Sequence, residues 1–580
     1  MKTLPVFSVL TAALTALCLT LPVFSPSAFS QQDATAKLKP VLTLKVASLK
    51  TIAATGTKIA ELADAKAQWN EMLAQIEALE GINIDNPLWL ILRSDGNEIK
   101  APILYLPIDN FDKINVPGAE ALKSDLKDDG KGNLRINTPL GLFVAVKKKG
   151  AYVVTLQEYV KDLPDDPNTL IAGLEKYLLG IKIDFENTSA QSIENSLALI
   201  QMFAMMSAPN SGEGIDQAVK SIMQLHKEFA SMTFGLTFNT GNADTEVVVD
   251  VVPREGSSMA KQIQEESKFK SPFNGFTFND RDTVFSINMV RYIDEEVLKT
   301  FDEGFSTFSD ALLNQLEENG DVEEDTLKFV EDYLALIKET GAAVFEKDNV
   351  FNAAAALSSD GILLEAAAVK DTGKVNELFK KTFDVFRKAV LKQNESAVEK
   401  IDELFKKYVK KDVKTVADFK ISTLIVPLKE LDENEQLPKV LKDKTFAAYW
   451  AVKENNAVAF AAGFDELKTE KALTDALEAT KEPAAVKNPQ MVIALRPLGV
   501  LLKNFGVDTV DDKAKLITDV LITTGNNAKI AVFQDSPTKA RVSVNGRAIS
   551  TFLKLVKVLQ DDSASSGTGG TLDRKTIRDF

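Results

Sequence analysis

The fold is decided by the stretch Asn352-Ala353-Ala354-Ala355-Ala356-Leu357, Ser358-Ser359-Asp360-Gly361, Ile362-Leu363-Leu364-Glu365-Ala366-Ala367-Ala368-Val369. Two apolar runs flank a short polar segment that ends in glycine, which is typical of a β-hairpin. A long helical pattern then begins at Val375. The stretch therefore predicts a hairpin followed by a helix that packs on it.

The same order of elements recurs along the chain. Further hairpins are predicted at 89–106, 142–156, 234–252, 446–462 and 529–544. A second unit, one strand followed by one amphipathic helix, precedes several of the hairpins. The combined order occurs at about 181–266, 284–391 and 491–559. We interpret this repetition as internal duplication with divergence.

These patterns predict an α+β fold in which repeated strand–helix and β-hairpin–helix units form antiparallel or mixed sheets packed against long amphipathic helices. The predicted segments are a signal peptide at 1–30, a helical N-terminal segment at 31–80, a first α+β domain at 81–270, a helix-rich middle α+β domain at 271–415, a C-terminal α+β domain at 416–560 and a disordered tail at 561–580. The tail is polar and rich in Ser and Gly, so it cannot bury enough apolar surface to order itself.

The first 30 residues have the pattern of a secretory signal peptide. Lys2 precedes an apolar run from Val6 to Leu21, and Ala28-Phe29-Ser30 places small residues before a cut at Gln31. An uncleaved anchor is the alternative, but the run is short for a span. No later stretch has the length for a second span. We therefore expect an exported protein, periplasmic or extracellular, with no integral membrane span after signal removal.

Catalytic side chains are scarce in this sequence. Cys18 is the only cysteine and lies in the predicted signal peptide, and His226 is the only histidine. These counts exclude disulfides, thiol catalysis and Cys/His metal sites from the mature chain. His226 lies in a helical pattern without a G-x-S-x-G motif to accompany it, so a surface or boundary histidine is the simpler interpretation. We predict no catalytic residues and no cofactor.

The charge balance bears on partners. The net charge of −15 disfavours binding to nucleic acid and to anionic membrane surfaces. One basic patch stands out at the predicted end of the longest helix, where cations are favourable and where a partner or a lipid headgroup is the alternative. It consists of Lys406, Lys407, Lys410, Lys411 and Lys414.

Two acidic segments are candidate calcium sites, because calcium needs only oxygen ligands. The closer candidate surrounds two glycines but lacks the ligand spacing of an EF-hand; it consists of Asp125, Asp128, Asp129 and Asn133. The second precedes a predicted helix, where acidic side chains favourably meet the helix dipole; it consists of Asp321, Glu323, Glu324 and Asp325.

Phenylalanine-rich helix faces are the feature with most functional promise. They carry Phe301, Phe305 and Phe308, and then Phe379, Phe383 and Phe386. Helix-on-sheet core is the simpler interpretation, and a cleft for an apolar ligand is the alternative.

The segment Arg254-Glu255-Gly256-Ser257-Ser258-Met259-Ala260-Lys261 follows a predicted hairpin. Together with the repeated order of elements, it resembles large uncharacterised exported proteins of planctomycete-type bacteria. The resemblance spans most of the mature chain and implies no activity and no site residues. We expect an exported, non-enzymatic envelope or extracellular binding or scaffold protein. A carrier of a lipid or other apolar ligand, and a hydrolase that uses carboxylates alone, are the alternatives.

Overall fold

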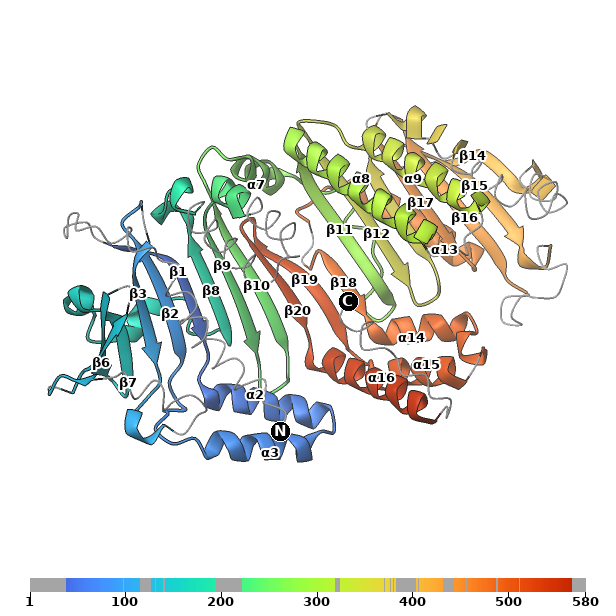
Figure 1. The fold of residues 1–580 in the computed structure, drawn as a ribbon. Helices are drawn as coiled ribbons and strands as arrows, with labels where there is room; N and C mark the ends of the chain where they lie inside the picture. Colours follow the sequence, from blue (N-terminus) through green and yellow to red (C-terminus); the bar gives the residue numbers. More distant parts are fainter. Residues whose placement is uncertain are drawn as a thin grey trace. The chain divides into compact units, whose positions relative to one another are not determined.

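The computed structural model describes residues 38–97, 99–114, 127–130, 132–138, 141–193, 222–318, 324–369, 371–375, 377–378, 380–381, 403–404, 406–430, 443–454, 456–486, 489–510 and 512–565. The fold is mixed α+β with antiparallel strands, as predicted (Figure 1). The chain divides into two compact units, Met1–Lys268 with Phe533–Ser543, and Phe269–Val532 with Val544–Phe580. The predicted signal peptide lies outside the described residues.

The first unit contains an antiparallel sheet. In order across the sheet its strands are β4 (Lys127–Asp128), β5 (Leu134–Thr138), β6 (Gly141–Lys148), β7 (Ala151–Leu156), β3 (Ile99–Leu106), β2 (Leu88–Ser94), β1 (Lys39–Val46), β8 (Leu179–Asp184), β9 (Phe229–Phe238) and β10 (Thr245–Pro253). Strand β10 also pairs with β20 (Lys539–Val544), which comes from the far end of the sequence. Helix α7 (Ser258–Lys268) follows β10.

The prediction of a wholly helical segment at 31–80 is wrong for its first part. Residues Lys39–Val46 form strand β1, in which alternate side chains are buried with the period of a strand. Helices α2 (Leu49–Leu62) and α3 (Lys66–Glu77) follow. Gly56 lies within α2, and the ring of Trp69 on α3 occupies the space where a side chain at position 56 would lie.

The second unit contains another antiparallel sheet. Its strands are β14 (Val409–Val416), β15 (Phe419–Pro427), β16 (Thr445–Lys453), β17 (Ala457–Gly463), β13 (Leu363–Ala368), β12 (Asn349–Ser358), β11 (Thr283–Ile293), β18 (Met491–Ala494) and β19 (Lys529–Ser536). The predicted domain boundary at 415/416 falls inside β14, and β13 pairs with β17 across it. The residues on its two sides therefore share one sheet.

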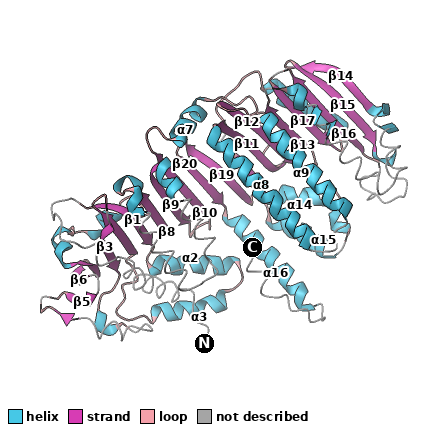
Figure 2. Ribbon diagram, turned by 45° about the horizontal axis from the view of Figure 1, so that its top comes forward, coloured by secondary structure: helices cyan, strands magenta, loops and turns pink. Residues whose placement is uncertain are grey.

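The second unit also contains most of the long helices (Figure 2). They are α8 (Glu295–Glu318), α9 (Glu324–Val344), α13 (Glu466–Ala479), α14 (Leu495–Asn504), α15 (Asp512–Thr524) and α16 (Gly546–Ser565). The predicted disordered tail begins too early, because α16 continues through 561–565. Residues 566–580 lie outside the described part of the chain.

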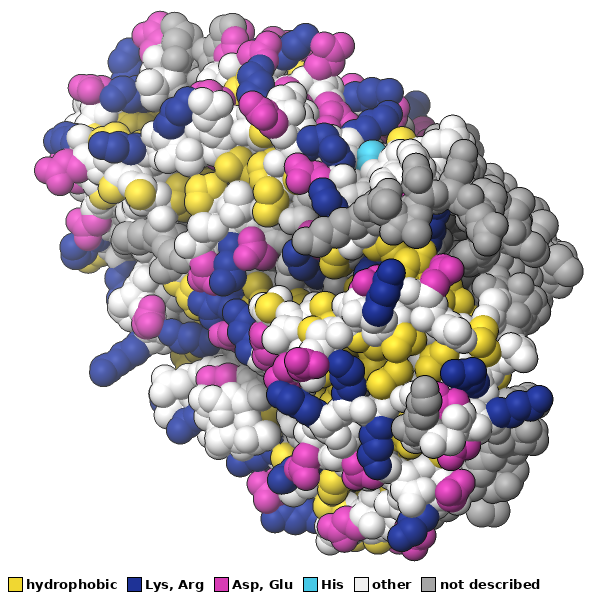
Figure 3. All heavy atoms as spheres, turned by 90° about the vertical axis from the view of Figure 1, so that its left-hand side faces the viewer, with side chains coloured by type: hydrophobic (Ala, Val, Ile, Leu, Met, Phe, Trp, Pro, Cys, Tyr) yellow, Lys and Arg dark blue, Asp and Glu magenta, His cyan; other side chains and the backbone are white. Residues whose placement is uncertain are grey.

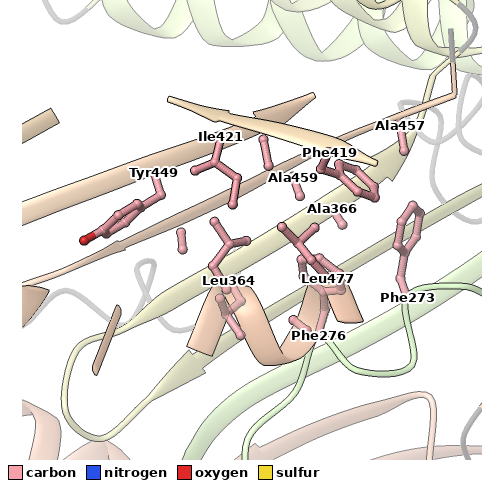
Figure 4. Packing of buried hydrophobic residues seen from close by; sticks show 14 of the residues in the cluster. Phe273, Phe276, Leu364, Ala366, Phe419, Ile421, Tyr449, Ala457, Ala459 and Leu477 are labelled. Atoms are coloured by element: carbon pink, nitrogen blue, oxygen red, sulfur yellow. The ribbon is translucent and has the colours of Figure 1, made fainter. Parts of the chain in front are cut away.

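One face of the second sheet forms a core with α13 (Figure 4). Leu473 and Leu477 of α13 are almost fully buried against strand residues that include Leu364, Ile421 and Tyr449. Burying a leucine side chain contributes about 1.5–3 kcal/mol, so this cluster is a main source of stability for the unit. Because side chains alternate along a strand, the residues between these core positions point to the other face.

Candidate functional site

The other face of the second sheet carries an unusual row of side chains. Ala355 pairs with Glu365, Glu365 with Phe460, and Phe460 with Trp450. Directly paired residues project from the same face, so these four side chains, on β12, β13, β17 and β16, lie side by side. Ile287 on β11 pairs with Ala355 and extends the row. We call the surface around this row the Glu365 face.

Glu365 has only apolar neighbours on this face. The residues two positions away on its own strand and on the two adjoining strands are Leu363, Ala367, Ala353, Leu357, Val458 and Ala462. Most of them are half-buried rather than buried, in contrast with the residues on the α13 side. The result is an apolar surface that water still reaches, with one carboxyl group at its centre.

The environment of Glu365 is electrostatically distinctive. Burial raises the pKa of its carboxyl group, and no charged neighbour contributes to the shift. Its side chain is nevertheless exposed to solvent. Neighbouring protein atoms therefore reduce the hydration of this carboxyl group without removing its contact with solvent. Among the described residues it has no hydrogen-bond or ion-pair partner.

Helices α8 and α9 lie on one side of the second sheet, and their contacts place them on the side of the Glu365 face (Figures 1 and 2). Phe345, just after α9, packs edge-on against Phe351 of β12, with ring centroids 5.0 Å apart. Phe351 shares its face with Ala353 and Ala355, because the three are spaced by two along one strand. Phe301 of α8 packs against Phe345 at 5.1 Å. An aromatic chain thus links α8 to the Glu365 face.

The structure separates the predicted phenylalanine residues into different roles. Phe301 and Phe305 stack on each other at 6.0 Å and are half-buried. Phe308 is 57% exposed, and Met289, which lies opposite Ala353, is 37% exposed. The other three candidates, Phe379, Phe383 and Phe386, lie outside the described residues. Phe308 on α8 and Met289 on β11 are single exposed apolar side chains, which by themselves do not define a binding surface.

Glu365 was missed as a site residue at the sequence level. The signal was a single charged residue inside an apolar run, Ile362 to Val369, on a strand that has neighbours on both sides. Charged residues are rare at such positions unless they are paired. Its neighbours on β12 belong to the same hairpin, but those on β17 come from a strand far away in sequence.

His226 has a structural environment. Its Nε2 atom lies 3.2 Å from the backbone oxygen of Thr188, and its ring packs edge-on against Phe185. The Nε group of Arg254 donates to the His226 carbonyl oxygen at 3.2 Å. These contacts fix the end of the helical turn before β9, and they fit the expectation of a boundary histidine.

The first calcium candidate forms a turn stabilised by its own side chains. Asp128 accepts a hydrogen bond from the Gly130 amide at 2.8 Å, and Asp129 accepts two from Asn133. Arg135 also lies 3.5 Å from Asp129. These carboxylates therefore have protein donors that stabilise the turn without a cation. Asp125 lies outside the described residues, as do Asp321 and Glu323 of the second candidate, whereas Glu324 and Asp325 begin α9.

Contrary to the prediction from the sequence, the five lysines of the basic patch do not all lie at the end of a helix. Lys410, Lys411 and Lys414 belong to β14, a strand that pairs only with β15 among the described strands. The pairing is irregular between Lys410 and Lys414, as in a β-bulge. Lysines and bulges on an edge strand prevent edge-to-edge association, which gives the patch a physical reason other than ligand binding.

Other properties of the chain also bear on its function. Within the described ranges, no group of three or more His, Cys, Asp or Glu side chains could hold a metal ion, and no helix has the length and apolar character to cross a membrane. On the face shown in Figure 3, basic and acidic side chains are interspersed. No family model matches the chain, and no match was found among curated proteins or among solved structures.

Proposed function

We propose that the protein is an exported, non-enzymatic binding protein that holds an apolar ligand on the Glu365 face of its second unit. The observation that carries this proposal is the row Ile287, Ala355, Glu365, Phe460 and Trp450, in which apolar side chains lie on both sides of one solvent-exposed carboxyl group. Ligand sites are mostly apolar with a few polar groups that orient the ligand.

The environment of Glu365 favours binding over carboxylate-based hydrolysis. Glycosidase chemistry pairs two carboxyl groups about 5–10 Å apart. All of the residues directly or diagonally opposite Glu365 are apolar, so the register places no second carboxylate beside it. Of the described carboxyl groups whose pKa is shifted, Glu365 alone has a raised pKa.

The binding proposal can be tested by native mass spectrometry of the mature protein from its own host, followed by organic extraction. A stoichiometric apolar ligand is expected. In parallel, Ala355→Trp should fill the face and abolish binding of a fluorescent apolar probe such as N-phenyl-1-naphthylamine. The matched control is Ala172→Trp, at an exposed position of the first unit. Equal probe binding by both variants would contradict the proposal.

Export predicts that the isolated protein begins at Gln31. N-terminal sequencing of protein from the periplasm or the culture medium tests this. A chain that begins at Met1 and stays with the cell membrane would instead support the anchor alternative.

We also propose that the hairpin–helix units are products of internal duplication. Hairpins β9–β10 and β16–β17 are each followed by a helix, α7 and α13. If the two hairpin–helix segments are duplicates, they should superpose in an experimental structure, with the same strand direction and with the helix on the same face of the hairpin. A helix on the opposite face in one unit would argue against common origin.

A further inference from the structure

On the basis of the proposed function, we infer that the ligand of the Glu365 face is an apolar cation whose positive group pairs with the Glu365 carboxylate. The inference deepens the proposal from an apolar ligand in general to one of defined charge. It depends on the position of Glu365 within an apolar surface, and on the lack of a described ion-pair partner for its carboxylate.

The carboxylate of Glu365 is the only charge among its neighbours on the face. No described lysine or arginine pairs with it, although such pairs are frequent elsewhere in the second unit, as between Lys468 and Asp360 at 2.7 Å. An ionised carboxylate crowded by apolar groups loses hydration and gains nothing in return. A ligand that brings a positive charge into contact with it removes this penalty and adds a charge-assisted hydrogen bond.

The remaining ligand classes fit less well. A neutral apolar ligand would cover the carboxylate and leave it without a partner, which is costly for a charged group. A fatty-acid anion would place two negative charges side by side, which is more costly still. Only the cation makes burial of Glu365 favourable.

The dimensions of the face suit an extended hydrocarbon chain. Neighbouring strands lie about 4.8 Å apart, so Trp450 on β16 and Ile287 on β11 each lie about 10 Å from Glu365 along the row. A chain that starts at Glu365 therefore stays over apolar side chains for roughly 10 Å in either direction. A long-chain alkylammonium ion is the simplest probe with these properties.

The experiment compares three probes with the same chain and different charge: dodecylammonium and dodecanoate, each below its critical micelle concentration, and dodecanol below its solubility in water. Displacement of N-phenyl-1-naphthylamine from the mature protein at neutral pH gives their relative affinities. We expect dodecylammonium to bind at least about tenfold more tightly than dodecanol, the gain of one charge-assisted contact. Dodecanoate should bind most weakly.

Two variants localise the effect. Glu365→Gln preserves shape and should weaken dodecylammonium binding about tenfold while leaving dodecanol unchanged. Glu482→Gln, at an exposed position of the same unit, should change neither. Circular dichroism confirms that each variant is folded before binding is measured.

The outcomes separate the two levels of the argument. If dodecanol or dodecanoate binds as tightly as dodecylammonium, or if Glu365→Gln has no effect, the charge inference is overturned and the apolar site stands. If none of the three probes binds and the host protein carries no extractable ligand, the proposed function fails as well.

Discussion

Glu365 on β13 lies directly opposite Phe460 on β17, and the residues directly and diagonally opposite it on both neighbouring strands are apolar. The ring and its neighbours exclude water from one side of the carboxyl group, so the charged form is disfavoured and its pKa is raised. This pair therefore makes the stability of the second unit depend on pH. Under the proposed function, it also determines which ligand charge the Glu365 face prefers.

The first prediction concerns this pH dependence. Because the pKa of Glu365 is higher in the folded than in the unfolded state, its contribution to stability is fully present below the usual glutamate value of 4.5 and is lost as pH rises through the folded value. Glu365→Gln should therefore stabilise the protein slightly at pH 7, a small effect because solvent screens this exposed carboxylate. Urea unfolding at pH 3.5 and pH 7 checks this. A variant equally or less stable at pH 7 would contradict it.

A second prediction concerns the first unit, where Gly180 and Gly235 face each other across β8 and β9. The ring of Tyr177 lies over Gly235, in the space a side chain there would occupy. Gly235→Ala should destabilise the protein by about 1–3 kcal/mol through overpacking. The control is Gly304→Ala, where a methyl group meets nothing within 4 Å; it should be neutral or stabilising.

The overpacking explanation has an internal test. Tyr177→Ala removes the ring, so adding Gly235→Ala to it should cost much less than adding Gly235→Ala to the natural protein. Additive changes in the free energy of unfolding would show that Gly235 is needed for a different reason.

A third prediction concerns Lys45 on β1, whose side chain is buried. Its ammonium group donates to the backbone oxygen of Glu175 at 3.1 Å and to that of Tyr177. Lys45→Met leaves both carbonyl groups without this donor and should cost about 1–3 kcal/mol. Thermal unfolding measures the loss. Lys50→Met, at an exposed ion pair of the next helix, is the control and should change little.

The titration of Lys45 adds a pH signature. Burial lowers its pKa, although Glu175 opposes the shift. The folded state therefore binds fewer protons than the unfolded state just below pH 10.5, and this group adds stability as pH rises through that window. The stability difference between the natural protein and Lys45→Met should grow as pH rises toward 10.5. A constant difference would argue that Lys45 keeps its ordinary pKa.

A fourth prediction concerns the edge strand β14. If Lys410 and Lys411 protect the edge, the double substitution to Thr should promote self-association without loss of secondary structure. Size-exclusion chromatography at increasing protein concentration is the measurement. The control replaces Lys513 by Thr on the exposed start of α15. If both variants stay monomeric to the same concentration, the edge needs no lysines.

The hairpins could be predicted from sequence because their signals are local. The turn Ser358 to Gly361 has its glycine at φ +78°, a conformation that glycine adopts at little cost. Strand β1 was missed because its buried face carries Thr43 and Lys45, which hide the alternation expected of a strand. Strand β14 was missed because its lysines continue the charge pattern of the preceding helical segment.

The site could not be predicted in the same way. Ala355, Glu365, Phe460 and Trp450 become neighbours only through the pairing of β12 with β13, of β13 with β17 and of β17 with β16. Strands β13 and β17 are far apart in sequence, with β14, β15 and β16 between them. A shift of one residue in the register of β13 would turn Glu365 toward α13. Local patterns cannot fix a register of this kind.

The pairing of β10 with β20 has a consequence for biosynthesis. A ribosome or a secretion channel delivers the chain from its N-terminus, so β10 emerges long before the strand that covers its edge. The first unit thus waits for residues 533–543 while the second unit is being made. During that interval an open strand edge is exposed to other nascent chains. Chaperones that hold this edge until residues 533–543 have been made would decide how much of the protein folds correctly.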